Sequence, residues 1–207
     1  MLVIQDAITD PAEFDHIYPQ PAAPSVRKVT HCLTAAYRRL IEASPFVAVA
    51  TCGADGIDCS PRGDSAGFVR VVDAYTLLLP ERRGNNRIDS LRNLVFDPRI
   101  ALLFLVPGIP ETLRVNGHAV VSRNAPLCDS FAVNGNPPRV VIVVEIESVY
   151  FQCGRAILRS QLWNPALFHN AEDLPTAGTM LAEATEGENG CPAHDAALAE
   201  RMRTTLY

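Results

Sequence analysis

Short apolar runs of strand length, separated by turn sequences, dominate the middle of the chain. Turns such as Gly53-Ala54-Asp55-Gly56 and Pro107-Gly108-Ile109-Pro110 contain the residues that interrupt regular structure. The pattern predicts strands over Phe46–Thr51, Ile57–Pro61, Phe68–Val72, Tyr75–Leu79, Ile100–Val106, Thr112–Ser122 and Arg139–Phe151. Antiparallel pairs joined by short turns favour a barrel or sandwich over alternating βαβ units.

Helical spacing of apolar residues precedes the first strand. The spacing predicts one helix over Ser25–Ala43, which ends at Ser44-Pro45 because the residue before a proline avoids helical backbone angles. Further helices are expected over Arg87–Phe96, Ala125–Val133 and His194–Leu206. The acidic, Gly- and Pro-containing stretch Ala171–Cys191 is predicted to be a loose loop.

Composition and charge narrow the class of protein. Hydrophobic residues make up 48% and charged residues 20% of 207, which is enough apolar material for a buried core. A net charge of -5 argues against nucleic acid as the main partner. No signal peptide is visible, and the best apolar run, Val140–Val144, is far shorter than a membrane span, so we expect a cytoplasmic protein without membrane contact.

The six cysteines carry no recognisable metal or disulfide signature. They are scattered without the close pairs that zinc sites use, so no metal site is predicted. In the absence of an export signal, we expect reduced thiols. The positions are Cys32, Cys52, Cys59, Cys128, Cys153 and Cys191.

Two arginine-containing segments are candidate anion sites. In Ser60–Ser65, Arg62 ends a predicted strand and Gly63 follows it, a pattern that lets backbone approach a ligand while guanidinium grips phosphate. In the segment 82–87, three arginines precede a predicted helix, whose first amides attract negative charge. Each segment is also compatible with a solvated polar turn or loop, in which the arginines pair with nearby acids or face water.

A third segment, 151–163, follows the longest predicted strand. Arg155 and Arg159 are four residues apart, so they share a face on a helix, and Trp163 follows them. Such a face could cover a planar ring system. The alternative is an amphipathic helix that caps the barrel, with the tryptophan as its packing anchor.

The order of these segments resembles the pyridoxamine 5'-phosphate oxidase superfamily of FMN-binding split barrels. The run Asp97–Phe104 is similar to the family's NPRV-x-LLF strand, and Thr112–Ala119 is similar to its Q-V-x-V-x-G-x-A strand. The resemblance is closer to a bacterial subgroup of uncharacterised probable FMN-dependent enzymes, which share the runs Ser60–Val72, 84–87, Leu113–Gly117 and Arg159–Trp163. The resemblance covers about Ser25 to Trp163, together with the terminal residues Thr204, Leu206 and Tyr207. It implies a mainly β fold with flanking helices, an antiparallel split β-barrel.

The resemblance also implies a set of residues that bind FMN. Arg62 and Arg87 match the two basic residues at the cofactor phosphate, while Thr112 falls where the oxidase has a flavin-contacting Gln. The full set of implied contacts is Arg62, Gly63, Asp64, Ser65, Leu79, Pro80, Asn86, Arg87, Thr112, Gln152, Arg155 and Arg159. No counterpart of the oxidase's substrate-binding Lys, Tyr, Arg and Ser is clear, which argues against pyridoxamine phosphate as the substrate.

The resemblance further implies an FMN-dependent oxidoreductase that acts on a small molecule. The expected assembly is a homodimer with FMN at the subunit interface. Residues 1–24 are expected to form an arm, 25–163 the barrel, and 164–207 an extension that packs on the barrel or on the partner subunit. The alternatives are a split barrel that binds flavin or haem without turnover, and a barrel without a cofactor. The sequence identifies no catalytic residue.

Overall fold

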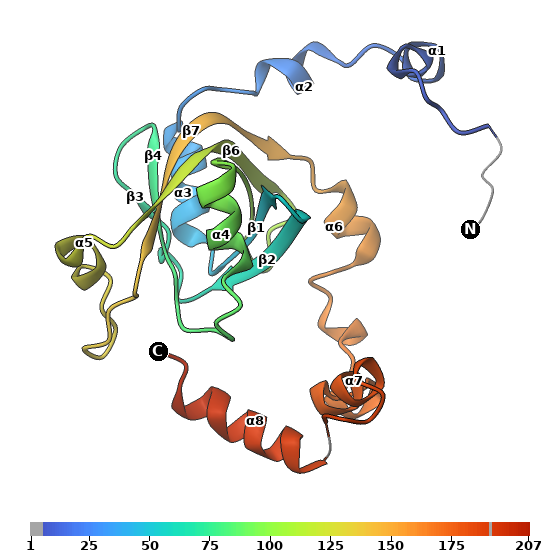
Figure 1. Cartoon of the computed structure of the whole chain (residues 1–207). Coiled ribbons are helices and arrows are strands. Elements are labelled where there is room, and N and C mark those ends of the chain that lie inside the picture. The colour runs from blue at the N-terminus through green and yellow to red at the C-terminus, as the bar shows by residue number, and fades with distance from the viewer. Residues whose placement is uncertain (1–5, 191) are drawn as a thin grey trace.

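The computed structural model describes residues 6–190 and 192–207, and its centre is one antiparallel sheet of seven strands (Figure 1). The strands lie in the order β2-β1-β5-β6-β7-β4-β3. Their bounds are β1 Phe46–Gly53, β2 Gly56–Gly63, β3 Arg70–Val71, β4 Thr76–Pro80, β5 Arg99–Leu105, β6 Thr112–Ser122 and β7 Val141–Gln152. The sheet curls around its own apolar face, so the predicted split β-barrel is confirmed.

Alternate residues of each strand point into this barrel. Val47 and Val49 of β1 are fully buried, and the strand paired with it, β5, contributes Leu102 and Phe104 at 1% exposure each. Burying each of these side chains contributes about 1.5–3 kcal/mol to folding. The positions between them, Ala48 and Leu103, are also apolar but lie on the other face of the sheet, where they are only half-buried.

Gly117 creates an irregularity in the long β6–β7 pair. The register shifts between Asn116 and Gly117, so that one residue of β7, Glu147, has no partner on β6. A Cβ at Gly117 would overlap the carbonyl oxygen of Glu145. Only glycine allows this close approach, and the resulting bulge bends the strands into the curvature of the barrel.

Two ion pairs join the edges of the sheet. β2 is one edge strand, and residues 81 and 82 follow β4 near the other edge. Arg62 contacts Glu81 (Nε to Oε2, 2.9 Å), and Asp64 contacts Arg82 (Oδ2 to Nε, 2.7 Å). Side-chain pairs therefore link the sheet edges at this point.

The helix predicted over Ser25–Ala43 is wrong as a single element. The chain instead forms α2, Ala23–Arg27, and α3, Ala35–Ala43. Between them Thr30 exchanges two backbone hydrogen bonds with Val149 of β7, of 3.0 and 2.8 Å, which a helix would forbid. Thr34 then caps α3 by accepting a hydrogen bond from the amide of Tyr37.

The remaining helices flank the barrel or extend from it. α4, Asp89–Phe96, packs on β1, while α5, Ala125–Asp129, is shorter than the predicted segment 125–133. α6, Arg155–Ser160, follows β7, and the Trp163 indole beyond it donates to the carbonyl of Ile109 at 2.9 Å. Trp163 therefore fixes the exit of the chain from the barrel.

The predicted loose loop over Ala171–Cys191 is also wrong in part. It contains the short 3-10 helix η3, Ala171–Asp173, and α7, Ala177–Ala184. Thr176 caps α7, and Asp195 of α8, Pro192–Thr204, accepts a 2.7 Å hydrogen bond from the Gly178 amide. These contacts order a segment whose composition alone indicated a loop. A further 3-10 helix, η2, spans Pro165–Leu167.

The N-terminal segment extends away from the barrel in Figure 1. It holds η1, Pro11–Glu13, α1, Phe14–Ile17, and α2, and every residue from 6 to 27 is exposed. Within the described residues, no helix has the length and apolarity needed to cross a bilayer. Five of the cysteines are free thiols, and Cys191 lies outside the described residues.

Candidate functional site

A groove of about 1060 Å³ lies where the two edges of the sheet meet. Its walls come from the end of β2, the loop from residue 81 to 88, the start of α4, the loop before β7 and Tyr207. Five arginines and three carboxylates line it, so its wall is net positive. These charged residues are Arg62, Arg82, Arg83, Arg87, Arg139, Asp58, Glu81 and Asp89. A groove with this charge is suited to an anionic ligand.

Arg62 extends into the groove from the end of β2. Its Nε donates to Glu81 and its Nη1 donates to the carbonyl of Pro61 at 3.0 Å. The side chains of Arg62 and Glu81 are 16% and 18% exposed, so the Arg62 guanidinium is held in one position by its neighbours. Its Nη2 makes no hydrogen bond within residues 6–190 and 192–207, which leaves a donor for a ligand.

The loop that carries Arg87 adopts a costly backbone conformation. Asn86 and Ile88, on either side of Arg87, have φ angles of 63° and 55°. The left-handed region is unfavourable for a β-branched residue such as Ile88, and such strain is common at functional sites. This conformation places Arg87 just before the N-terminus of α4, where its Nε donates a 2.8 Å hydrogen bond to Oδ2 of Asp89.

The N-terminus of α4 opens on the same groove. Ile88 is the N-cap residue and provides no side-chain hydrogen bond, and residues 88–91 all line the groove. The first amides of an uncapped helix are free to bind an acceptor, and the helix dipole favours a negative one. Two arginines and these amides are thus directed at one space.

Asp58 of β2 links two walls of the groove through two hydroxyl groups. Its Oδ2 accepts hydrogen bonds from Ser90 at 2.8 Å and from Ser60 at 2.9 Å. The Ser90 bond contributes most to holding the pKa of Asp58 below its usual value, and the Ser60 bond and the charges of Arg62 and Arg87 add to it against the effect of burial. Asp58 therefore stays ionised and ties β2 to α4.

Comparison with known proteins identifies the family. The family model described as pyridoxamine 5'-phosphate oxidase matches residues 33–153, more than half of the chain. The chain belongs to the pyridoxamine 5'-phosphate oxidase family. No curated protein gave a significant sequence match.

Solved structures similar to this member of the pyridoxamine 5'-phosphate oxidase family share little sequence with it. HupZ from Group A Streptococcus is 19% identical with a TM-score of 0.48, and the match covers 58% of this chain and 94% of HupZ. A relative of general stress protein 26 from Clostridium acetobutylicum is 15% identical with a TM-score of 0.44, covering 57% and 86%. An F420 reductase is 18% identical with a TM-score of 0.42, covering 56% and 98%.

Four of the implied FMN contacts of this family member lie together. Arg62, Gly63, Asn86 and Arg87 all line the groove, although they come from two segments more than 20 residues apart. A side chain at Gly63 would press on the carbonyl of Pro45, its Cβ lying 3.3 Å from that oxygen. The small residue keeps the end of β2 close to the preceding strand and open to the groove.

Four more predicted contacts are neighbours in sequence of groove residues but do not line the groove. Asp64 pairs with Arg82 and is covered, its side chain being 5% exposed, and the exposed Ser65 donates its amide to Asp64 at 2.7 Å. Leu79 is buried in the barrel core, and Pro80 is buried next to it. These two residues end β4 directly before Glu81, which lines the groove.

Four predicted contacts lie apart from the groove within the chain. Thr112 pairs with Gln152 at one end of β7, whereas Pro80 pairs with Val141 at the other end. The eleven residue-to-residue steps from Val141 to Gln152 span about 36 Å along the strand at the usual rise. Arg155 and Arg159 follow on α6, where both are exposed. None of the four lines the groove.

Sequence reasoning missed several groove residues. No sequence motif marks Glu81 or Ser90 as a site residue, although Glu81 directly precedes the arginine-rich segment 82–87. Asp58 could have been found from its place four residues before Arg62, on the same face of β2. Tyr207 is among the terminal residues that the resemblance includes, but its contact with Asp64, 143 residues away, has no local signal in the sequence.

Proposed function

We propose that this member of the pyridoxamine 5'-phosphate oxidase family is an FMN-dependent oxidoreductase that holds the FMN phosphate in the arginine groove. The observation that carries the proposal is the convergence of Arg62 and Arg87 with the uncapped N-terminus of α4 on one net-positive groove. Guanidinium groups and helix amides are the donors that proteins use for phosphate monoesters.

The donor set fits a phosphate. Arg62 offers its Nη2, which has a fixed direction because Glu81 and Pro61 hold the other guanidinium nitrogens. Arg87 is more exposed, at 75%, and its Asp89 partner lies in the first turn of α4. Phosphate would compete with that exposed pair, whose own contribution is small.

Bound FMN would supply hydride transfer to or from a small molecule, and the chain would supply binding, orientation and exclusion of water. The residues around the groove contain fixed carboxylates and arginines, which suit the holding of a charged ligand. Asp58 has a lowered pKa and two hydroxyl donors, so it acts as a structural acceptor here. Our proposal therefore assigns no proton-transfer role to this chain's groove residues.

We further propose a homodimer with FMN at the subunit interface. One chain provides the groove, while Thr112, Gln152, Arg155 and Arg159 lie at the other end of β7 and would reach the flavin of the partner. Exposed apolar side chains favour a partner surface on this part of the molecule. They include Phe46 at 37%, Ile109 at 41%, Phe151 at 37%, Leu158 at 65% and Leu162 at 43% exposure.

Flavin reduction tests the enzymatic part of the proposal. Protein loaded with FMN is mixed anaerobically with NADH or NADPH, and bleaching of the flavin absorbance is followed. We expect reduction that is faster than that of free FMN under the same conditions. Loaded protein that no nicotinamide or other two-electron donor reduces faster than free FMN would contradict the oxidoreductase and leave the binding-only alternative.

A further inference from the structure

Tyr207 reaches the groove from a remote part of the chain. Its phenol donates a 2.7 Å hydrogen bond to Oδ1 of Asp64, which follows β2. The tyrosine also lines the groove. The segment between α6 and Tyr207 leaves the barrel and returns to it at this contact (Figure 1). The hydrogen bond between Tyr207 and Asp64 therefore attaches the C-terminal segment to the barrel at the groove.

Asp64 collects three donors on its two oxygens. Oδ1 accepts from Tyr207 and from the Ser65 amide, and Oδ2 accepts from Nε of Arg82 at 2.7 Å. The side chain is only 5% exposed. Burial works against ionisation, but the bonds from Tyr207, Ser65 and Arg82 outweigh it and hold the pKa of Asp64 below its usual value.

Arg82 is the groove-facing end of this network. Its Nη1 donates to the carbonyl of Phe131 at 2.8 Å, and its side chain is 15% exposed. The Tyr207 ring lies 5.6 Å from Cζ of Arg82, within the range of a cation–π contact. The Nη2 of Arg82 makes no hydrogen bond within the part of the chain that the structure describes.

We propose that Tyr207 is a positioning residue that, through Asp64, fixes the guanidinium of Arg82 as a donor to an anionic group in the groove. The inference rests on the proposed function, since it adds Arg82 to the donors of the same groove. Asp64 and the carbonyl of Phe131 each accept a hydrogen bond from one nitrogen of the Arg82 guanidinium, so the remaining nitrogen, Nη2, points in a fixed direction. A donor fixed before binding loses less conformational entropy when the anion arrives.

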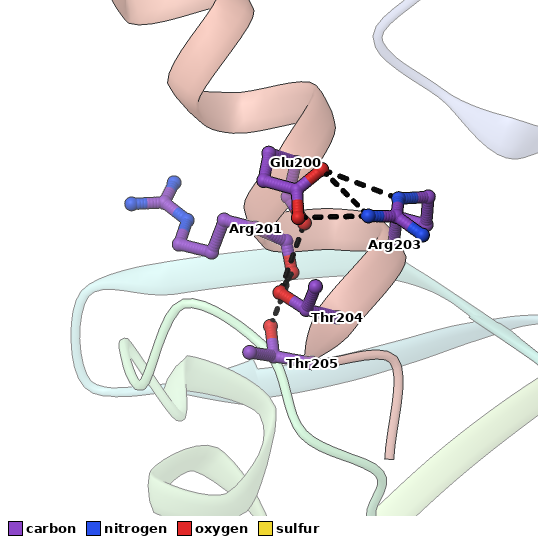
Figure 2. Close-up of polar contacts among 5 residues, drawn as sticks. All are labelled: Glu200, Arg201, Arg203, Thr204 and Thr205. Carbon is purple, nitrogen blue, oxygen red and sulfur yellow. Dashed lines mark hydrogen bonds and ion pairs between the residues drawn. The ribbon is translucent and has the colours of Figure 1, made fainter.

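The end of α8 prepares Tyr207 for this contact. Figure 2 shows that Thr204 and Thr205 turn their hydroxyl groups back to the carbonyls of Glu200 and Arg201, with distances of 2.9 and 2.6 Å. Arg203 grips the Glu200 carboxylate at the same end. These hydroxyl groups add hydrogen bonds to the carbonyls of the last turn, and the helix ends at Thr204, three residues before Tyr207.

The test compares Tyr207→Phe with wild type. The substitution keeps the ring and removes only the hydroxyl that fixes Asp64. Affinity for inorganic phosphate and for FMN is measured by calorimetry, with phosphate titrated into FMN-free and FMN-loaded protein. We expect about a threefold to tenfold loss of anion affinity, as for an indirect effect of one charged hydrogen bond. Asp64→Asn should weaken binding at least as much.

Tyr37→Phe is the matched control. It removes another phenol hydrogen bond, the 2.8 Å bond to the Lys28 carbonyl, from a partly buried site outside the groove. We expect it to lower the melting temperature without changing anion affinity. A purely structural role for Tyr207 would give the same result in both variants. The pH profile adds a second readout, since the loss of one donor to Asp64 moves the acid limb of anion affinity in Tyr207→Phe to higher pH.

The outcomes separate the source of the anion. Weaker FMN binding assigns Arg82 to the cofactor phosphate, and weaker phosphate binding only in FMN-loaded protein assigns it to an anionic substrate. If wild type binds no FMN but binds phosphate less tightly after Tyr207→Phe, the positioning role stands while the proposed cofactor fails. Unchanged affinities and an unchanged pH profile in Tyr207→Phe would overturn the inference.

Discussion

Arg62 and Glu81 form an ion pair across the split of the barrel, with Nε and Oε2 2.9 Å apart. The pair contributes both to the fold and to the proposed binding site. It links the edge strand β2 to the segment after β4, and it also lines the groove proposed for FMN phosphate. The two roles can be separated by substitution.

Arg62→Ala and Arg87→Ala should both weaken FMN binding, by about tenfold or more, because each removes a charged donor. Their effects on stability should differ. Arg62→Ala leaves the Glu81 carboxylate partly buried and unpaired, which costs about 1–3 kcal/mol in the free energy of unfolding. Arg87 is exposed, and its loss should change that free energy by less than about 0.5 kcal/mol. Urea denaturation and flavin-fluorescence titration measure the two quantities, and equal stability losses would contradict the account.

Glu81→Gln should strengthen the binding of FMN and inorganic phosphate by about threefold to tenfold. It removes a negative charge that faces the ligand and competes for Arg62, whereas the amide oxygen of the glutamine can still accept the Nε hydrogen bond that positions Arg62. The control is Glu42→Gln, which breaks the exposed pair with Arg38 outside the groove and should leave binding unchanged. Weaker binding of phosphate to Glu81→Gln than to wild type would show that Glu81 positions Arg62 more than it competes for it.

Acid stability should depend on Asp64. Its folded-state pKa lies below the unfolded value of about 3.9, so the ionised carboxylate stabilises the fold above that pH and the contribution is lost as the pH falls through the folded-state pKa. The stability difference between wild type and Asp64→Asn should therefore be constant above about pH 5 and shrink below about pH 4. Urea denaturation at a series of pH values gives this difference. A difference that grows on acidification would be inconsistent with the hydrogen bonds described.

Mixed dimers test whether one site draws on two chains. An Arg62→Ala/Arg87→Ala variant and a Gln152→Ala/Arg155→Ala variant should each bind FMN poorly alone. After unfolding and refolding together, half of the dimers are mixed, and each has one intact site, so about a quarter of all sites should recover. The count of flavin per chain after desalting reports the recovery. A molar mass equal to one chain, or no recovery in a mixture that does form dimers, would contradict the shared site.

Much of the barrel could be predicted from the sequence because its strands carry local signals. Thr112–Ser122 has the same bounds in the prediction and the structure, and β1, β5 and β7 differ from their predictions by one or two residues at most ends. The errors came from distant partners. The helix over Ser25–Ala43 was broken by the backbone pairing of Thr30 with Val149, which no local pattern of residues 25–43 reveals.

In the candidate site, too, local sequence patterns predicted single residues but not their distant partners. Arg62 and Arg87 were predicted from local motifs and a family resemblance, and both line the groove. That Arg62 would face Glu81, and Asp64 would face Arg82 and Tyr207, depends on how the edges of the sheet meet. Closure of this kind is a property of the whole sheet, so its side-chain pairs are visible only in the folded chain.

The visible spectrum of the protein tests the central claim most directly. Protein is purified without added cofactor, and its spectrum is recorded before and after addition of FMN and desalting. The account predicts a retained flavin spectrum in wild type and its loss in a folded Arg62→Ala/Arg87→Ala variant. Wild-type protein that retains no flavin after this treatment would contradict FMN binding in the arginine groove.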